Sequence, residues 1–277
     1  MTEAYLTGAS LSLYRNKLMT TILETQHLRK EFGGLIAVED VSIRIEQGQT
    51  HSIIGPNGAG KTTFFNLLSG KYRPTKGRVI YKGEDITAVP LHRRAHIGLG
   101  RSFQITNLFP QLTVLENVRL AAQALSSITF NFWQRTDRYT DYHNRALAVL
   151  EMVGLQHVAR QPANTLPHGG KRKLELALLL APDPEVLLLD EPTAGMASEQ
   201  VPELMQVIAR VREQGGKTIV MVEHNMRVVM GISDRITVMD HGQVLAEGTP
   251  QQIAANQTVQ NVYLGELYDL KEVGHGG

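Results

Sequence analysis

The sequence predicts an α/β fold in which a parallel β-sheet core carries an antiparallel β layer and an inserted helical subdomain. Three short apolar runs, at 51–54, 186–189 and 218–222, show almost no polar alternation, which is typical of parallel strands buried on both faces. A helical pattern follows each run, as expected for strands joined by crossover helices. Residues 41–46 instead alternate apolar and polar side chains, and this period of two predicts an antiparallel strand with one face in solvent.

The middle third of the chain has a helical pattern. Thr113 and Glu116 have the Thr-x-x-Glu spacing of a capping box, which marks a helix N-terminus. Apolar side chains then share one helical face in two stretches: Val114, Val118, Ala121, Ala122 and Leu125, then Ala146, Val149, Leu150 and Val153. We therefore divide the chain into an extension at 1–20 that we expect to be disordered, an α/β core at 21–105 and 181–250, a helical subdomain at 106–180, and a C-terminal segment at 251–277.

Composition excludes several classes of protein. The 277 residues include 28 Lys and Arg against 27 Asp and Glu, so a basic surface for nucleic acid is not expected and we predict no nucleic-acid partner. The absence of Cys excludes disulfides and thiolate chemistry. The longest apolar run, 176–181, is far shorter than the roughly 18 residues of a membrane-spanning helix. Arg15 and Lys17 follow the weakly apolar N-terminal residues instead of preceding them, so no secretory signal peptide is expected.

The strongest motif is a glycine-rich loop at 55–62. Its sequence, Gly-Pro-Asn-Gly-Ala-Gly-Lys-Thr, fits the phosphate-binding pattern and lies between a buried strand and a helix predicted to begin near Lys61. Backbone N–H groups of such a loop surround phosphate oxygens, and the helix N-terminus adds the positive end of its dipole. Lys61 is expected to reach the β- and γ-phosphates, and Thr62 to offer its hydroxyl to Mg²⁺. A glycine-rich turn is the ordinary alternative, but the flanking strand and helix favour phosphate binding. The nucleotide contacts we expect here are Gly55, Pro56, Asn57, Gly58, Ala59, Gly60, Lys61, Thr62 and Thr63.

Two further buried strands end in candidate catalytic side chains. The run 186–189 leads directly into Asp190 and Glu191. Alone, such a pair is as consistent with a strand-end cap as with a site. Beside a phosphate loop, Asp190 is expected to hold Mg²⁺, and Glu191 to orient and deprotonate the attacking water. His224 follows the next buried run and is expected to bridge Glu191 and the γ-phosphate, although an isolated His is more often structural.

Together these motifs resemble the nucleotide-binding subunits of ATP-binding cassette (ABC) transporters, which implies a P-loop NTPase core of the RecA-like type. The resemblance extends from about Ile22 to Glu266 and includes five motifs in the order of the family. They are the phosphate loop at 55–63, Gln104 in a Ser-Phe-Gln sequence, the signature-like Leu-Pro-His-Gly-Gly at 166–170, the strand that ends at Glu191, and His224.

The resemblance implies roles for residues that the chain's own pattern leaves open. It makes Phe32 the aromatic side chain that stacks on adenine. It makes Gln104 a Mg²⁺ ligand, beside Thr62 and Asp190, and a link to a membrane partner. A further implication is a pair of subunits that enclose two nucleotides head to tail. The residues that would then bind the γ-phosphate of ATP on the neighbouring subunit are His168, Gly169 and Gly170.

Other stretches resemble the ATPases of branched-chain amino acid importers and the related urea and amide systems. They include the sequences at 108–118, at 191–196 and at 263–266, and the insert around Trp133. This resemblance implies an ATP-hydrolysing subunit, with ATP and Mg²⁺ as cofactors, that energises uptake of a small polar solute such as a branched-chain or other amino acid. The implied location is the cytoplasmic face of the cell membrane, as a peripheral protein. The implied partners are a second ATPase subunit, identical or related, a polytopic permease and, indirectly, an extracytoplasmic solute-binding protein.

The chain departs from the family pattern at two positions of the signature and at one position farther on. Pro167 lies where the family usually has a Ser whose hydroxyl bonds the γ-phosphate across the dimer, Gly170 replaces a Gln, and Ala197 replaces an Asp that communicates between the two sites. A lost hydrogen bond to a charged group costs about 1.5 to 3 kcal/mol. We therefore expect γ-phosphate binding by the signature to be weakened, and the coupling between sites with it.

Two other functions remain open. A soluble cassette ATPase of translation or DNA repair is one, although tandem cassettes and long coiled-coil arms are not evident in the sequence. A regulatory subunit that binds ATP and hydrolyses it weakly is the other: Pro167 and Ala197 favour it, whereas Glu191 and His224 favour an enzyme.

Three groups of residues have an ordinary structural interpretation beside a functional one. The cations at 171–173 are either a solvated helix face or phosphate contacts. Residues 92–94 are expected to be a solvated turn after Pro90. Trp133, with its neighbours Phe130 and Phe132, is expected in the core of the helical subdomain or in contact with the membrane partner.

Overall fold

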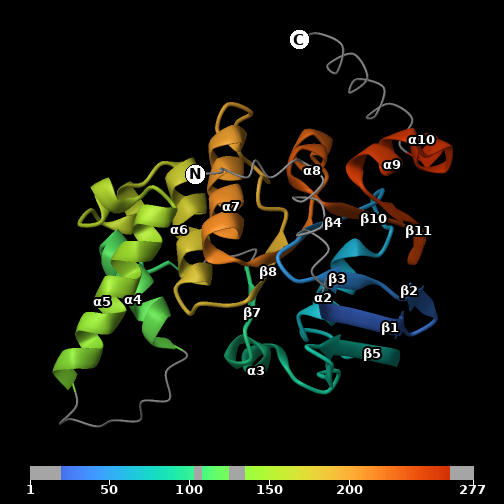
Figure 1. Ribbon diagram of the computed structural model, residues 1–277, viewed down its shortest axis with the longest axis horizontal. Helices are drawn as coiled ribbons and strands as arrows, with labels where there is room; N and C mark the ends of the chain where they lie inside the picture. The colour runs from blue at the N-terminus through green and yellow to red at the C-terminus, as the bar shows by residue number, and fades with distance from the viewer. Residues whose placement is uncertain (1–19, 103–107, 125–134, 263–277) are drawn as a thin grey trace, which may run out of the picture.

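The computed structural model describes residues 20–102, 108–124 and 135–262. Its main sheet has the strand order β11-β10-β4-β9-β8-β7 (Figure 1). Neighbouring strands are parallel except in the hairpin of β10 and β11, and this confirms the predicted parallel core. The strands of this sheet are β4 (Thr50–Ile54), β7 (Leu99–Arg101), β8 (Val186–Asp190), β9 (Thr218–Val222), β10 (Arg235–Asp240) and β11 (Gln243–Gly248).

Strands β4, β8 and β9 are buried along their whole length. Successive side chains of a strand point to opposite faces, so each strand contributes to two cores. In β8, Leu187 and Leu189 belong to a cluster with the helical part of the chain, whereas Val186 and Leu188 belong to a cluster with the antiparallel layer. The unbroken apolar runs that predicted these strands are therefore a consequence of burial on both faces.

A second, antiparallel sheet has the order β2-β1-β5-β6, with β3 also paired to β1. The single strand predicted at 41–46 is wrong in detail, because the structure breaks it at 42–43. The Thr25 hydroxyl fills the break by donating to the Val41 carbonyl at 3.1 Å and accepting from the Ile43 N–H at 3.0 Å. The strands are β1 (Thr21–Phe32), β2 (Leu35–Val41), β3 (Arg44–Glu46), β5 (Lys76–Tyr81) and β6 (Glu84–Asp85).

The helices divide into those that surround the main sheet and a group beside it. In Figure 1, α4, α5 and α6 lie together in green and yellow, away from the blue antiparallel layer. Within the described ranges, no helix combines the length and the apolar character needed to cross a bilayer. The α-helices are α2 (Lys61–Leu68), α3 (Leu91–His96), α4 (Val114–Ala124), α5 (Arg135–Met152), α6 (His168–Leu180), α7 (Val201–Gly215), α8 (Met226–Ile232), α9 (Pro250–Ala255) and α10 (Gln257–Val262); 3-10 turns span Gln156–Val158 and Ala163–Thr165.

Helix α4 begins at the predicted capping box. Thr113 Oγ1 accepts from the N–H of Glu116 at 3.1 Å, and Glu116 Oε2 accepts from the N–H of Thr113 at 2.8 Å. The second predicted apolar face lies on α5 and its C-terminal end, and all four of its side chains are buried. Leu125, on the first face, lies outside the described residues, as does residue 106, so the predicted start of the subdomain stays a prediction.

Arg94 corrects the prediction of a solvated turn at 92–94. Its side chain is completely buried and donates to four backbone carbonyls. These are Leu67 at 3.1 Å, Leu68 at 2.6 Å, Ile86 at 2.7 Å and Val89 at 2.8 Å. The first two are carbonyls at the C-terminal end of α2, which have no partner within the helix itself. Arg94 thus fixes the far end of the helix that begins at the phosphate loop, and burial lowers the pKa of its guanidinium to about 10.

Arg94→Met should lower the free energy of unfolding by at least about 3 kcal/mol, because several buried carbonyls lose a charged donor. Urea unfolding followed by circular dichroism measures the change. The matched control is Arg93→Met, since Arg93 is the exposed neighbour on the same helix. A loss below about 0.5 kcal/mol for Arg94→Met would show that these hydrogen bonds do not stabilise the fold.

Candidate functional site

The phosphate loop connects the carboxyl end of β4 to the N-terminus of α2. Both ends of the loop pack backbone against backbone. A Cβ at Gly55 would lie 2.2 Å from the carbonyl oxygen of Met239. A Cβ at Gly60 would lie 2.3 Å from that of Ala37, and the φ of Gly60 is +91°, a conformation that other residues rarely adopt. Glycine is therefore required at both ends, whereas the tip at 57–58 is exposed.

Lys61 places a cation at the mouth of this loop. Its Nζ donates to the carbonyl oxygens of Gly55 at 2.6 Å and Pro56 at 2.9 Å. Burial lowers the pKa of Lys61, and the negative charge of Glu191 opposes that shift. Phosphate oxygens bind an ammonium more strongly than neutral carbonyls do, so a nucleotide would draw Lys61 away from these two partners.

Asp190 ends β8 and is buried beside Arg101 of β7. Arg101 Nη2 lies 3.2 Å from Asp190 Oδ2, and the two side chains are 8% and 3% exposed. The hydroxyl of Ser102 accepts from the Asp190 N–H at 3.0 Å. Burial lowers the pKa of Arg101, while Asp190 acts to raise it. Sequence analysis missed Arg101, because only the pairing of β7 with β8 brings it to the carboxylate.

The predicted Mg²⁺ ligands fit that ion by donor type. Thr62 supplies a hydroxyl and Asp190 a carboxylate, and Mg²⁺ is usually held by one or two carboxylates together with substrate phosphates and water. In the part of the chain that the structure describes, no group of three or more His, Asp or Glu side chains could hold a metal alone. Bound Mg²⁺ would therefore depend on the nucleotide. Gln104, the third predicted ligand, lies outside the described residues.

Glu191 and His224 come together at the carboxyl edge of the main sheet, as predicted. Glu191 Oε1 lies 4.0 Å from His224 Nδ1, and the side chains are 42% and 64% exposed. Glu191 has a φ of +46°, which costs a residue with a side chain about 1 to 3 kcal/mol. Its N–H donates to the carbonyl of Val222 at 2.9 Å, so the end of β9 holds this conformation. The exposed carboxylate is thereby directed away from the buried strand end and is free to contact water.

Phe32, the predicted adenine platform, lies at the end of β1 and is 43% exposed. One edge packs against Tyr72, with ring centroids 5.5 Å apart at 76°. Lys30 Nζ lies 5.0 Å from the centroid of the ring. The same hairpin of β1 and β2 carries Ala37, which contacts Gly60 in the phosphate loop. Phe32 is thus on an element fixed against that loop, and its role in stacking stays a prediction.

The signature residues Pro167 and His168 are exposed at the start of α6. Pro167 is the N-cap residue, and the helix has no side-chain hydrogen bond to its N-terminus. Gly169 lies beside Gln200, whose side-chain atoms would be 3.5 to 3.7 Å from a Cβ at that position. A Cβ at Gly195 would lie 3.9 Å from the His168 ring. The signature therefore borders the loop that follows Glu191 and remains open to a partner molecule.

Two of the three cations at 171–173 contact other elements, so the interpretation as a solvated helix face is wrong for them; a contact with phosphate stays a prediction. Arg172 donates to Glu175 at 2.7 Å and to the carbonyl of Ala194 at 3.0 Å. Lys173 forms an ion pair with Glu203 of α7. These contacts connect α6 to the segment that follows β8. Trp133, for which two roles were considered, lies outside the described residues.

The model of the ABC transporter family matches residues 38–194, and a second model, that of the branched-chain amino acid ATP-binding cassette transporter, matches 243–269. The chain belongs to the ABC transporter ATPase family. It is 40% identical over 250 residues to LivG of Escherichia coli K12, the high-affinity branched-chain amino acid transport ATP-binding protein, covering 88% of this chain and 98% of that protein. The comparisons confirm the P-loop NTPase fold and the ATPase class that the motifs predict.

Solved structures of ABC cassettes have the same architecture. The ADP conformation of MJ1267, an ATP-binding cassette of an ABC transporter, matches with a TM-score of 0.78 and 28% identity, over 89% of this chain and 100% of that chain. The dimeric post-hydrolysis state of the cassette MJ0796, bound to ADP and Pi, matches with a TM-score of 0.69 and 28% identity, over 83% and 99%.

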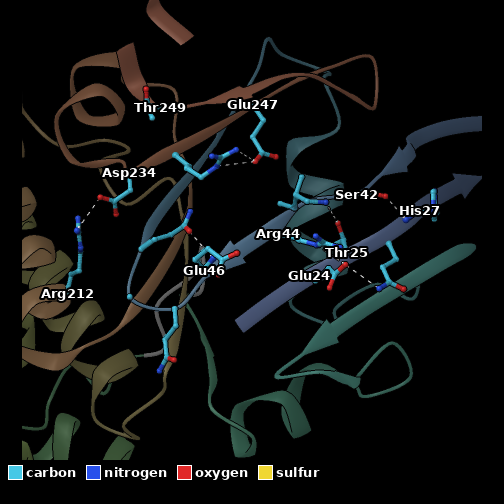
Figure 2. A pocket seen from close by; sticks show the side chains of 16 residues that line it. Glu24, Thr25, His27, Ser42, Arg44, Glu46, Arg212, Asp234, Glu247 and Thr249 are labelled. Carbon is cyan, nitrogen blue, oxygen red and sulfur yellow. Dashed lines mark hydrogen bonds and ion pairs between the residues drawn. The ribbon is translucent and has the colours of Figure 1, made fainter. Parts of the chain in front are cut away.

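The ABC ATPase also has a hollow of about 1260 Å³ at the amino edge of the main sheet, the edge opposite to the phosphate loop. It lies between the antiparallel layer and the amino ends of β4 and β10 (Figure 2). Among the described residues that line it, each of three arginines is paired with a carboxylate there. The pairs are Arg44–Glu24 at 3.2 Å, Arg212–Asp234 at 3.2 Å and Arg235–Glu247 at 2.6 Å. None of the predicted site residues lines this hollow.

Pro167→Ser should strengthen ATP-dependent dimerisation of the ABC ATPase several-fold in a Glu191→Gln background. A hydroxyl there would donate to a γ-phosphate oxygen across the dimer, while the ATP affinity of the monomer stays unchanged. Sedimentation velocity with and without ATP measures the dimer, and Pro162→Ser, an exposed proline of the same subdomain, is the control.

A serine at this N-cap would also stabilise α6 directly, by about 0.5 to 2 kcal/mol. Thermal unfolding separates that effect from dimerisation. An unchanged or weaker dimer, with or without a higher Tm, would contradict the assignment of a missing phosphate contact at Pro167.

Proposed function

We propose that this ABC ATPase hydrolyses ATP to energise uptake of branched-chain amino acids, as the peripheral subunit of an importer at the cytoplasmic face of a membrane. The observation that carries the proposal is the convergence of Lys61, Glu191 and His224 at one edge of the sheet. The similarity to LivG over nearly the whole of that protein supports the choice of solute.

We assign each residue at the carboxyl edge of the main sheet to a step of ATP binding or hydrolysis that its position allows. The phosphate loop binds the nucleotide through backbone N–H groups, and Lys61 exchanges its carbonyl partners for phosphate oxygens. Mg²⁺, held by Thr62 and Asp190, would neutralise phosphate charge. Glu191 accepts the proton of the attacking water. His224 bridges Glu191 and the γ-phosphate and so keeps the water and the phosphate aligned.

A second ATPase subunit is the first partner that we infer. Pro167 and His168 of the signature are exposed beside the loop that follows Glu191, so we infer that the signature acts on ATP bound to a second ATPase subunit. The dimeric state of MJ0796 supports this arrangement. A polytopic permease and, through it, an extracytoplasmic solute-binding protein complete the proposed importer.

Glu191→Gln should lower turnover at least about a hundredfold while ATP binding is retained, because the general base is lost and the phosphate loop is untouched. Steady-state phosphate release and calorimetric titration with ATP measure the two quantities. Glu199→Gln makes the same change at an exposed position of the following loop and should leave both unchanged. Single-turnover hydrolysis by Glu191→Gln at the wild-type rate would rule out the assignment.

The transport function is tested by affinity purification of the tagged chain from membranes, followed by reconstitution of the co-purified complex in liposomes. We expect a polytopic protein to co-purify and labelled leucine to accumulate only with ATP, with Glu191→Gln as the inactive control. Co-purification of ribosomes or DNA instead would support a soluble cassette ATPase.

A further inference from the structure

Glu223 is a completely buried carboxylate between the end of β9 and His224. Each of its two oxygens contacts a different loop. Oε1 accepts from the N–H of Thr193 at 2.9 Å and from its hydroxyl at 2.6 Å. Oε2 accepts from the N–H of His224 at 3.1 Å and of Asn225 at 3.3 Å. One side chain therefore spans the loop after β8 and the loop after β9.

These are the two loops that carry the catalytic pair. Thr193, itself buried, is two residues beyond Glu191, and His224 directly follows Glu223. Burying a carboxylate is costly unless its oxygens are hydrogen-bonded, and here four donors compensate the cost. An apolar side chain would fill the same space without that cost, but it would hold neither loop.

We propose that Glu223 is a positioning residue for ATP hydrolysis, which holds the Glu191 loop and the His224 loop in a fixed relation. The inference rests on the roles proposed above for Glu191 and His224. Their side chains are 4.0 Å apart, beyond hydrogen-bond distance, so no hydrogen bond between them sets their spacing. Glu223 supplies that constraint through its hydrogen bonds to both loops. The constraint matters because displacement of a reacting group by about 1 Å costs on the order of a hundredfold in rate.

Glu223→Gln has nearly the same size and tests the link directly. An amide has one acceptor oxygen and one NH₂ group, so it satisfies the N–H groups of only one loop. We expect kcat to fall at least tenfold, while KM for ATP and the Kd for ADP change less than twofold, because Glu223 does not touch the phosphate loop. A purely structural role would instead lower the Tm and weaken nucleotide binding together with kcat.

A second pair of variants keeps the test independent of the folding of Glu223→Gln. Thr193→Val removes one of the four donors with little change in volume and should lower kcat about three- to tenfold. Thr193→Ser restores the hydroxyl and should recover most of the loss. If kcat for Thr193→Val equals that of the wild type, or if KM rises as kcat falls, the positioning role is wrong.

The Glu191→Gln background separates this inference from the proposed function. In single-turnover assays, Glu223→Gln should cause little further loss once Glu191 is replaced, since one of the two groups whose relation it fixes is then gone. An additive loss would overturn the positioning role. If Glu191→Gln alone retains wild-type turnover, the role proposed above for Glu191 fails instead; if it is inactive and Glu223→Gln turns over normally, only this inference fails.

Discussion

The candidate site depends on direct backbone packing around the phosphate loop. Gly60 lies against Ala37 of the antiparallel layer, and Gly55 lies against Met239 of the main sheet. Gly242, in the turn after β10, adds a third contact, because a Cβ there would be 3.1 Å from the same Ala37 oxygen. Backbone atoms in contact cannot repack as side chains do. The phosphate loop is therefore fixed in position relative to both sheets. The proposed catalytic groups, which lie at the ends of strands in the main sheet, are fixed relative to the loop as a result.

Three carboxylates follow the buried strands at this edge, and their surroundings give them different properties. Asp190 is paired with Arg101 inside the protein, and Glu223 is surrounded by four hydrogen-bond donors. Glu191, in a left-handed backbone conformation, is the most exposed of the three, with 42% of its side chain accessible. The oxygens of the other two carboxylates already accept from donors inside the protein, so Glu191 is the one of the three that solvent water can reach.

Much of the fold and part of the site could be predicted from the sequence, because the evidence for them is local. Apolar runs without alternation predicted β4, β8 and β9, and Thr113 with Glu116 predicted the start of α4. The glycine loop and the strand ends at Glu191 and His224 followed from motif and order. Each of these patterns depends on residues close together in the chain, and burial on two faces or a helix N-terminus leaves a recognisable mark on them.

Arg94, Arg101 and Glu223 could not be predicted in this way. A charged residue in a polar stretch or at the end of an apolar run is ordinarily exposed. Each of these is buried because its partners come from distant parts of the chain: Arg94 finds the carbonyls at the end of α2, and Glu223 finds Thr193 thirty residues away. The one signal in the sequence was the place of Glu223, directly between a fully apolar strand and His224, where a charge has little access to solvent.

The segment after Glu191 is held from two sides, and this bears on how the signature communicates with the site. Glu223, at the end of β9, accepts hydrogen bonds from Thr193. Arg172 of α6 donates to the carbonyl of Ala194, the next residue in the chain. The helix that begins at the signature is thus attached to the loop that carries Glu191, the proposed general base. Arg172 lies five residues beyond Pro167 on α6, so the loss of the usual serine leaves this attachment intact. The departure at Pro167 therefore leaves the connection between α6 and the Glu191 loop within this chain in place.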